Sequence, residues 1–99
     1  MKRISVCMAS YNGEAFIGKQ LRSIIDQLNV DDEVIISDDN STDNTLSVIS
    51  MFDDARIRVS SNQGRRGPVG NFEQALNKAC GEYILLADQD DIWHQIKLE

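Results

Sequence analysis

Cysteine, proline and long hydrophobic runs are all scarce in this 99-residue chain, which has two cysteines and one proline. Cys7 and Cys80 form no C-x-x-C motif and have apolar neighbours, so we expect two reduced thiols in the core. No apolar run approaches the roughly 20 residues that a membrane helix needs. The N-terminus enters a strand pattern too early to leave room for a signal peptide. These absences predict a cytoplasmic protein.

Positive charge is scarce as well. Ten Lys and Arg residues against sixteen Asp and Glu residues give a net charge of −6 and a pI near 4.6. Such a chain has no overall attraction for nucleic acid, so we expect no nucleic-acid partner. The hydrophobic share of 41% and the charged share of 26% are typical of a globular protein, and the length suits a single domain.

Short apolar segments alternate with longer amphipathic ones along the chain. The segment 33–37 is β-branched and too short for a helix, which indicates a strand buried on both faces. The segment 56–60 alternates between polar and apolar residues, as a half-exposed edge strand does. We expect four strands, at residues 4–9, 33–37, 56–60 and 83–87.

A helical pattern separates each strand from the next. The first places its apolar residues on one face over residues 17–28. The second follows the acidic segment 38–43, and the third follows the Gly-rich segment 62–68 and is expected to end before Gly81. The residues of the third helix expected to face the core are Val69, Phe72, Leu76 and Ala79. The predicted core as a whole comprises Val6, Ile17, Leu21, Ile24, Val34, Ile36, Ile49, Phe72, Leu76, Ile84 and Leu86.

This alternation predicts an α/β, Rossmann-like fold. Because crossovers between parallel strands are right-handed, the strands form a parallel sheet with helices on both faces. We expect about four strands in the order 3-2-1-4. The fourth strand is the most apolar, yet this order leaves it at an edge, so we also expect self-association through that exposed edge.

Polar and acidic residues follow three of the predicted strands. Ligands of open α/β sheets bind beyond the carboxyl ends of the strands, where the strand order reverses. The segments 9–12, 38–40 and 88–91 should meet there, and two of them carry clustered carboxylates. Carboxylates that converge repel one another unless a cation neutralises them, which indicates a Mg²⁺ or Mn²⁺ site with oxygen ligands.

An acidic loop can also be a solvated turn that caps a helix. For Asp43 we favour the capping role, and for Asp38 both interpretations stay open. Asp88 and Asp90 follow a buried strand directly, so for them we favour a ligand site.

Aromatic and basic residues near the same edge have two interpretations each. Tyr11 could stack on a base or be a partly buried loop residue. Arg65 and Arg66 could meet a diphosphate or form a solvated pair. His94 is better explained as a surface histidine than as a metal ligand.

Three segments together resemble the family-two glycosyltransferases of the GT-A fold: Val6–Gly13, Ile35–Asp43 and Gly81–Trp93. Their order, spacing and structural context make the set more specific than any one segment. The run Asp88–Trp93 with Lys97 resembles the bacterial polysaccharide branch that includes rhamnosyltransferases.

The resemblance implies transfer of a sugar, with inversion, from a UDP- or dTDP-sugar to an acceptor hydroxyl, assisted by Mn²⁺ or Mg²⁺. It implies nucleotide contacts from one set of loop residues: Ala9, Tyr11, Asn12, Asp39 and Asp88. In this set Asp39 would hydrogen-bond the pyrimidine edge. Asp88 and Asp90 would form the metal-binding D-x-D pair, with Asp90 as the direct ligand.

The chain departs from the family pattern in two loops and in length. Asn40 stands where many members have Gly, and Ala9 replaces a frequent Thr or Pro. The acceptor region and the catalytic carboxylate of the family lie further along than residue 99. We therefore expect residues 1–99 to be a single truncated donor-binding domain with no catalytic residue, which binds nucleotide weakly and transfers nothing.

The whole protein would then act on a glycan or lipid-linked acceptor, with peripheral membrane association left open. The alternative is a non-catalytic, doubly wound binding module similar to a phospho-acceptor receiver domain. Such a domain needs an acidic pair after the first strand, where this chain has Ser10-Tyr11-Asn12.

Overall fold

The computed structural model describes residues 3–88 and shows one four-stranded parallel sheet in the order β3-β2-β1-β4. The predicted α/β fold and strand order are confirmed. The elements are β1 (Ile4–Ser10), α1 (Ile17–Ile25), β2 (Glu33–Asp38), α2 (Thr45–Ser50), β3 (Ile57–Ser61), α3 (Pro68–Asn77) and β4 (Tyr83–Asp88).

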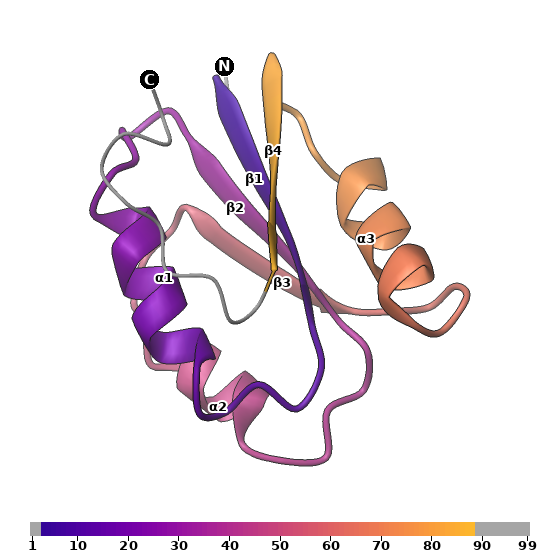
Figure 1. Cartoon of the computed structure of the whole chain (residues 1–99). Coiled ribbons are helices and arrows are strands. Elements are labelled where there is room, and N and C mark those ends of the chain that lie inside the picture. Colours follow the sequence, from indigo (N-terminus) through magenta and orange to yellow (C-terminus); the bar gives the residue numbers. More distant parts are fainter. Residues whose placement is uncertain (1–2, 89–99) are drawn as a thin grey trace.

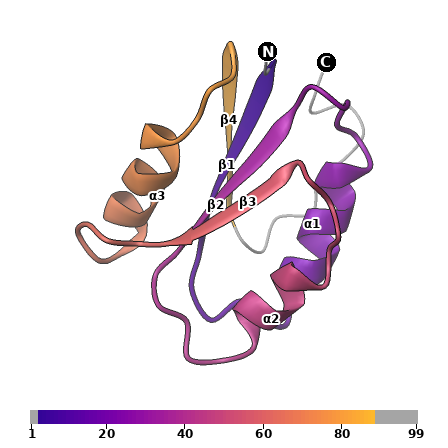
Figure 2. The ribbon, with the colours of Figure 1, turned by 180° about the vertical axis from the view of Figure 1, so that it is seen from behind.

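Helices cover both faces of the sheet, as expected. Figure 1 shows α1 and α2 on one side and α3 on the other, and Figure 2 shows the same layers from behind. All strands run from the top of Figure 1 to the bottom, so their carboxyl ends lie together at the lower edge. In the described part of the chain, no helix is long and apolar enough to cross a membrane.

The main core lies between the sheet and the pair α1 and α2. Alternate residues of β1 and β2 point into it, because successive strand side chains face opposite sides. Every residue of β2 is buried, whereas β3 is partly exposed, which confirms the predictions for both strands. The buried members of this core are Val6, Met8, Ile17, Leu21, Ile24, Ile25, Leu28, Val34, Ile36, Ile49 and Ala87.

The core on the α3 side is thin. Ala79 packs against it as predicted, but the predicted core positions Val69 and Leu76 are wrong. Val69 and Leu76 are exposed, and the buried residues of the helix are Gly70, Asn71 and Ala75. Asn71 donates from Nδ2 to the carbonyl oxygen of Ser10 at 3.1 Å, and this bond fixes the rotation of the helix about its axis. Small residues therefore face the sheet, and the larger apolar ones face outward. Phe72 is only half-buried.

Two core predictions in β4 are also wrong. Leu85 and Ala87 pack against the main core, but Ile84 and Leu86 are 47% and 59% exposed. They point to the opposite face, where α3 contacts β1 and β2 and leaves β4 uncovered. Cys80 is exposed too, contrary to expectation, whereas Cys7 is a buried free thiol as predicted.

A buried carboxylate joins the strands at the edge opposite the predicted site. Glu33 accepts hydrogen bonds from the Ser5 hydroxyl at 2.5 Å and from the Cys80 amide at 2.8 Å. Gly81 donates its amide to Ser5 Oγ at 2.7 Å, and a Cβ at this position would meet the Ser5 nitrogen at 2.7 Å. Because α3 already ends at Asn77, Gly81 serves this close approach and does not end the helix.

Candidate functional site

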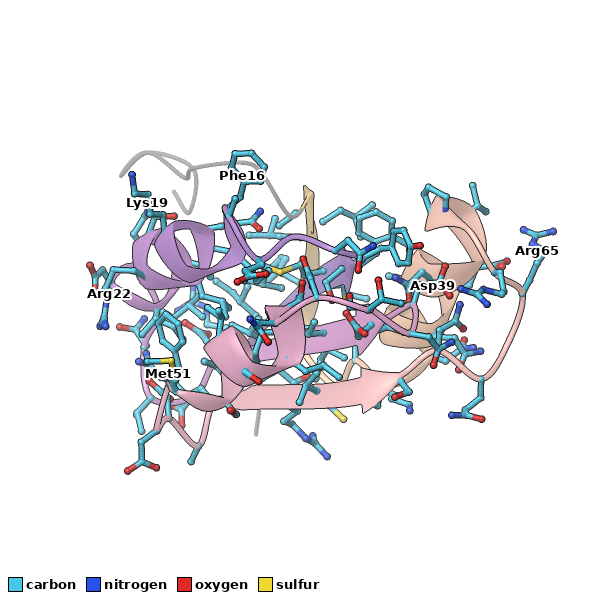
Figure 3. The ribbon with its side chains drawn as sticks, turned by 90° about the horizontal axis from the view of Figure 1, so that it is seen from below. Phe16, Lys19, Arg22, Asp39, Met51 and Arg65 are labelled. Carbon is cyan, nitrogen blue, oxygen red and sulfur yellow. The ribbon has the colours of Figure 1, made fainter. Side chains whose placement is uncertain are left out.

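The carboxyl edge of the sheet carries the loops singled out in the sequence. Figure 3 looks onto this edge and shows Asp39 on the side of Arg65, away from Phe16 and Lys19. The loop after β1 and the loop after β2 meet here, because the two strands pair in register up to Ser10 and Asp38.

The loop after β1 exposes an aromatic ring and is tied to the neighbouring loop. Tyr11 is 48% exposed at this edge. Asn12 has a positive φ of 47°, donates its amide to Ser41 Oγ at 2.9 Å, and accepts the Thr42 amide on Oδ1 at 2.8 Å. In the structure, the Asn12 side chain therefore joins two loops.

Asp38 organises the turn after β2. It is fully buried, and its Oδ1 accepts the hydroxyls of Ser10 at 2.6 Å and Ser41 at 2.7 Å, while Oδ2 accepts the Ser41 amide at 2.8 Å. The Asp38 carboxylate therefore holds this turn together from a buried position, whereas the capping interpretation places it in solvent. Asn40 has a φ of 60°, the left-handed conformation that Gly readily adopts at such a turn.

Asp43 precedes the N-cap Asn44 and binds the first amide of the second helix, which agrees with the capping role favoured from the sequence. Its Oδ1 accepts the amide of Thr45, the first residue of α2, at 2.9 Å, and its Oδ2 accepts the Glu14 amide at 3.2 Å. The Thr45 hydroxyl also donates to this carboxylate, and these bonds lower the pKa of Asp43.

Asp39 is the acidic residue that faces the Gly-rich loop. Its Oδ2 accepts the Gly67 amide at 3.0 Å, and its Oδ1 accepts the side-chain amide of Asn62 at 3.1 Å. The Arg66 guanidinium lies 3.6 Å from Oδ1. The Gly67 amide in particular, with Asn62 and Arg66, holds the pKa of Asp39 below its usual value against the effect of burial. Asp39 is therefore an ionised acceptor at the carboxyl edge.

The basic residues of the loop differ in their surroundings. Arg66 lies beside Asp39 and also donates to the Asp39 carbonyl oxygen at 3.4 Å, while most of its side chain stays exposed. Arg65 pairs only loosely with Glu73, at 3.4 Å between exposed groups. Arg66 is thus the better placed of the two to meet an anionic ligand next to Asp39.

Two glycines let this loop close onto α3. Gly67 has a φ of +97°, which disfavours a side chain, and its amide is the one that reaches Asp39. A Cβ on Gly70 would lie 2.0 Å from the carbonyl oxygen of Arg65, so the loop backbone crosses directly over this position.

The fourth strand brings the predicted metal-binding segment to the same edge. The backbone of Asp88 pairs with Ala9, a half-buried residue near the end of β1. Asp90 lies outside the described residues, as do His94 and the side chain of Asp88. Among residues 3–88, no three His, Cys, Asp or Glu side chains group together in a way that could hold a metal ion.

Sequence reasoning missed Asn62 and Asn71, the two buried asparagines that hold this edge together. Asn62 directly follows β3 and precedes Gly64, a position at which an asparagine commonly organises a turn. That signal was available in the sequence. The partner of Asn71 is a backbone carbonyl 61 residues away, which no local pattern indicates.

The family model described as "Glycosyl transferase family 2" matches residues 5–99. The chain belongs to glycosyl transferase family 2. Among curated relatives, it is 38% identical over 96 residues to the Escherichia coli glucosyltransferase WfgD, which acts on an N-acetylglucosamine diphosphoundecaprenol. It is 41% identical over 99 residues to the dTDP-rhamnosyl transferase RfbG of Shigella flexneri. These alignments cover 97% and 93% of this chain, but only 38% and 34% of the relatives.

Solved structures of glycosyltransferases have the same fold. Staphylococcus aureus TarS 1–349 superposes with a TM-score of 0.88 at 32% identity, over 97% of this chain and 30% of that one. The Pyrobaculum calidifontis mannosyltransferase PcManGT, solved with GDP-mannose and Mn²⁺, gives 0.86 at 28% identity over 97% and 30%. The family-two chain therefore has the predicted GT-A architecture. Its strand order also differs from the 2-1-3-4-5 order of receiver domains, which speaks against that alternative.

Proposed function

We propose that residues 1–99 form the donor-binding part of a glycosyltransferase that moves a sugar, with inversion, from a UDP- or dTDP-sugar to an acceptor hydroxyl. The chain spans about a third of the length of the relatives it matches, and the acceptor region and catalytic carboxylate would belong to the remainder. We expect this part alone to bind nucleotide and to transfer no sugar.

The observation that carries the proposal is the ionised Asp39 carboxylate at the carboxyl edge. An ionised carboxylate accepts about four hydrogen bonds, and the side chains and amides described above use two of them. The remaining acceptor positions suit the N3–H donor of a uracil or thymine base. The exposed ring of Tyr11 and the half-buried Ala9 lie at the ends of neighbouring loops and would line the base pocket with Asn12.

The metal would be held by Asp88 and Asp90, with Asp90 as the direct ligand. The register of β4 supports this, because it brings the backbone of Asp88 beside Ala9 at the nucleotide edge. Carboxylate oxygens suit Mn²⁺ or Mg²⁺, and a bound ion would neutralise the charge that develops on the leaving diphosphate. TarS has been solved with UDP, and a Mycobacterium tuberculosis glucosyl-3-phosphoglycerate synthase with Mn²⁺ and UDP, which fits this assignment.

The acceptor would be a glycan or a lipid-linked sugar in the synthesis of bacterial surface polysaccharide. The names of the relatives support this, since WfgD and a Campylobacter jejuni glucosyltransferase both act on undecaprenol-linked acceptors. A whole protein acting on such acceptors would work at the cytoplasmic membrane surface.

An amide NMR titration with UDP, dTDP and GDP tests the donor site. We expect base-dependent shifts at Tyr11 and Asp39, and broadening at the end of β4 when Mn²⁺ replaces Mg²⁺. Asp39→Asn should weaken UDP binding about 10-fold, because the amide nitrogen would face the donors that hold the carboxylate. Asp53→Asn removes the same charge from an exposed position and should leave the affinity unchanged. A folded protein that shifts with none of the three nucleotides would contradict the proposal.

A further inference from the structure

The side chain of Asn62 makes three hydrogen bonds at the nucleotide edge. Asn62 directly follows β3, and its backbone amide donates to the Asp38 carbonyl oxygen at 2.7 Å, extending the pairing of β2 and β3 by one residue. The residue is 6% exposed, so its side chain is held inside the loop and away from solvent. Asp39, which it contacts, is buried to a similar extent, at 7% exposed.

The side-chain amide of Asn62 contacts three groups. Nδ2 donates to Asp39 Oδ1 at 3.1 Å and to the Arg65 carbonyl oxygen at 2.9 Å, which uses both of its hydrogens. Oδ1 accepts the Gly64 amide at 2.9 Å. One side chain therefore connects the Asp39 carboxylate to two points of the Gly-rich loop.

The second oxygen of Asp39 closes this arrangement. Oδ2 accepts the Gly67 amide at 3.0 Å, so the loop is held at Gly64 and Arg65 through Asn62, and at Gly67 through Asp39. With one donor on each oxygen, the carboxylate cannot rotate freely. The direction of its remaining acceptor positions is set by residues that need not touch a ligand.

We propose that Asn62 is a positioning residue, which orients the Asp39 carboxylate for recognition of the base and couples it to the Gly-rich loop. The inference about the base rests on the proposed function, in which Asp39 accepts the N3–H of a pyrimidine. The coupling between Asn62, Asp39 and Gly67 does not depend on the proposed function. It can be measured without a ligand.

Asn62→Asp removes both bonds that Nδ2 donates, to Asp39 Oδ1 and to the Arg65 carbonyl oxygen. The new carboxylate can still accept the Gly64 amide, but it has no hydrogen to donate to Asp39 and carries a like charge. Asn44→Asp is a matched control, because Asn44 also donates from Nδ2 to a carboxylate, Glu14 Oε2 at 3.2 Å, at an exposed position.

Amide hydrogen exchange of the ligand-free protein tests the coupling. In Asn62→Asp, the Gly67 amide should exchange about 10-fold faster, although Asn62 makes no contact with it, because Asp39 is no longer held in place. The Gly64 amide should keep its protection, and Asn44→Asp should change neither. Unchanged exchange at Gly67 in a folded Asn62→Asp protein would overturn the proposed coupling.

Affinities for UDP and for UDP methylated at N3 test the role in base recognition. The unaltered protein should prefer UDP about 10-fold, because methylation removes the donor that Asp39 accepts. Asn62→Asp should reduce this preference to about twofold, whereas Asn44→Asp should retain it. Equal preference in Asn62→Asp and the unaltered protein would overturn the positioning role. If the unaltered protein shows no preference, the proposed role of Asp39 fails, and the exchange at Gly67 still decides the coupling.

Discussion

Asp38 and Asp39 are adjacent in the sequence, yet their carboxylates serve different purposes. Asp38 points into the turn and is satisfied by Ser41, three residues further on, and by Ser10 at the end of β1. Asp39 points to the opposite side and is satisfied by Asn62 and Gly67, from a loop more than 20 residues away. Since neighbouring residues at a strand end face opposite sides, one carboxylate builds the turn and the other faces the Gly-rich loop.

Among individual residues, the ion pair of Asp54 and Arg56 supports a prediction about stability in acid. Arg56 donates from Nη2 to Asp54 Oδ2 at 2.7 Å and from Nε to Oδ1 at 2.9 Å. These bonds lower the pKa of Asp54 to about 2, so the pair stabilises the fold above the unfolded pKa near 3.8 and loses this effect as the pH falls towards 2.

Asp54→Asn should therefore lower the free energy of unfolding by about 1 kcal/mol at pH 7, after allowance for partial solvent exposure. At pH 2.5 the difference should be much smaller. Urea unfolding at the two pH values measures both, with Asp53→Asn as the control for the loss of one charge. An equal effect of Asp54→Asn at both pH values would contradict the assignment of the low pKa to this pair.

At the scale of elements, two helical glycines should respond in opposite ways to the same change. Gly18 in α1 has room for a Cβ, whose nearest neighbour would be Val48 Cγ1 at 3.4 Å. Gly70 in α3 has none, because the Arg65 carbonyl oxygen would lie 2.0 Å away. Helix propensity alone predicts that both substitutions by Ala stabilise the protein.

We expect Gly18→Ala to stabilise the fold by about 0.5 kcal/mol and Gly70→Ala to destabilise it by about 2 kcal/mol. Gly70→Ala should also displace the Gly-rich loop from Asp39 and weaken UDP binding. Chemical denaturation and the NMR titration measure the two effects. A stable Gly70→Ala protein with normal nucleotide binding would show that the loop does not need its close contact with α3.

The buried Glu33 supports another prediction about elements, because it joins β1, β2 and the start of β4. Burial raises the pKa of its carboxyl group, but the Ser5 hydroxyl, the Cys80 amide and Arg58 outweigh this effect, and the pKa lies below its usual value. Glu33→Gln places a donor against these donors and should cost about 2 kcal/mol.

Arg58→Ala removes only a 3.4 Å ion pair whose guanidinium side is largely exposed, and should cost about 0.5 kcal/mol. Urea unfolding of Glu33→Gln and Arg58→Ala compares the stability contributed by the hydrogen bonds of Glu33 within the sheet with that contributed by its surface ion pair. If the two variants lost the same stability, the surface ion pair would be the important contact of Glu33.

At the scale of the whole molecule, the uncovered face of β4 bears on self-association. Tyr83, Ile84 and Leu86 are exposed at the end of the sheet, where β4 pairs only with β1 among the described residues. An apolar edge strand of this kind is a template for pairing with a second chain. We therefore predict that residues 1–99 form dimers or larger species as the concentration rises.

Light scattering at increasing concentration measures this association. Leu86→Lys should shift the protein towards the monomer, because a charge on the edge strand opposes pairing. Met51→Lys places the same charge on another exposed apolar residue, which lies beyond α2, and should have little effect. A protein that stays monomeric at high concentration would contradict the prediction.

Features that depend on residues close together in the sequence could be predicted, and features that depend on contacts between distant residues could not. Strands, helices and their order could be predicted, because periodicity and short connections are properties of neighbouring residues. The rotation of α3 could not, since it depends on a bond between Asn71 and Ser10 and on the approach of Arg65 to Gly70. The exposure of Ile84 and Leu86 also escaped prediction, because an apolar strand sequence does not reveal whether a helix covers both of its faces.

The sequence by itself determined the alternation of strands and helices, the parallel sheet, and the family, because each of these depends on local patterns and short motifs. Only the tertiary structure decided which acidic residue faces the Gly-rich loop and what holds it there. Asp39 gains its fixed orientation from Asn62 and Gly67, which β3 and the Gly-rich loop bring back to the end of β2. Hydrogen bonds between distant segments form only when the sheet is assembled, so they cannot be predicted from local sequence patterns.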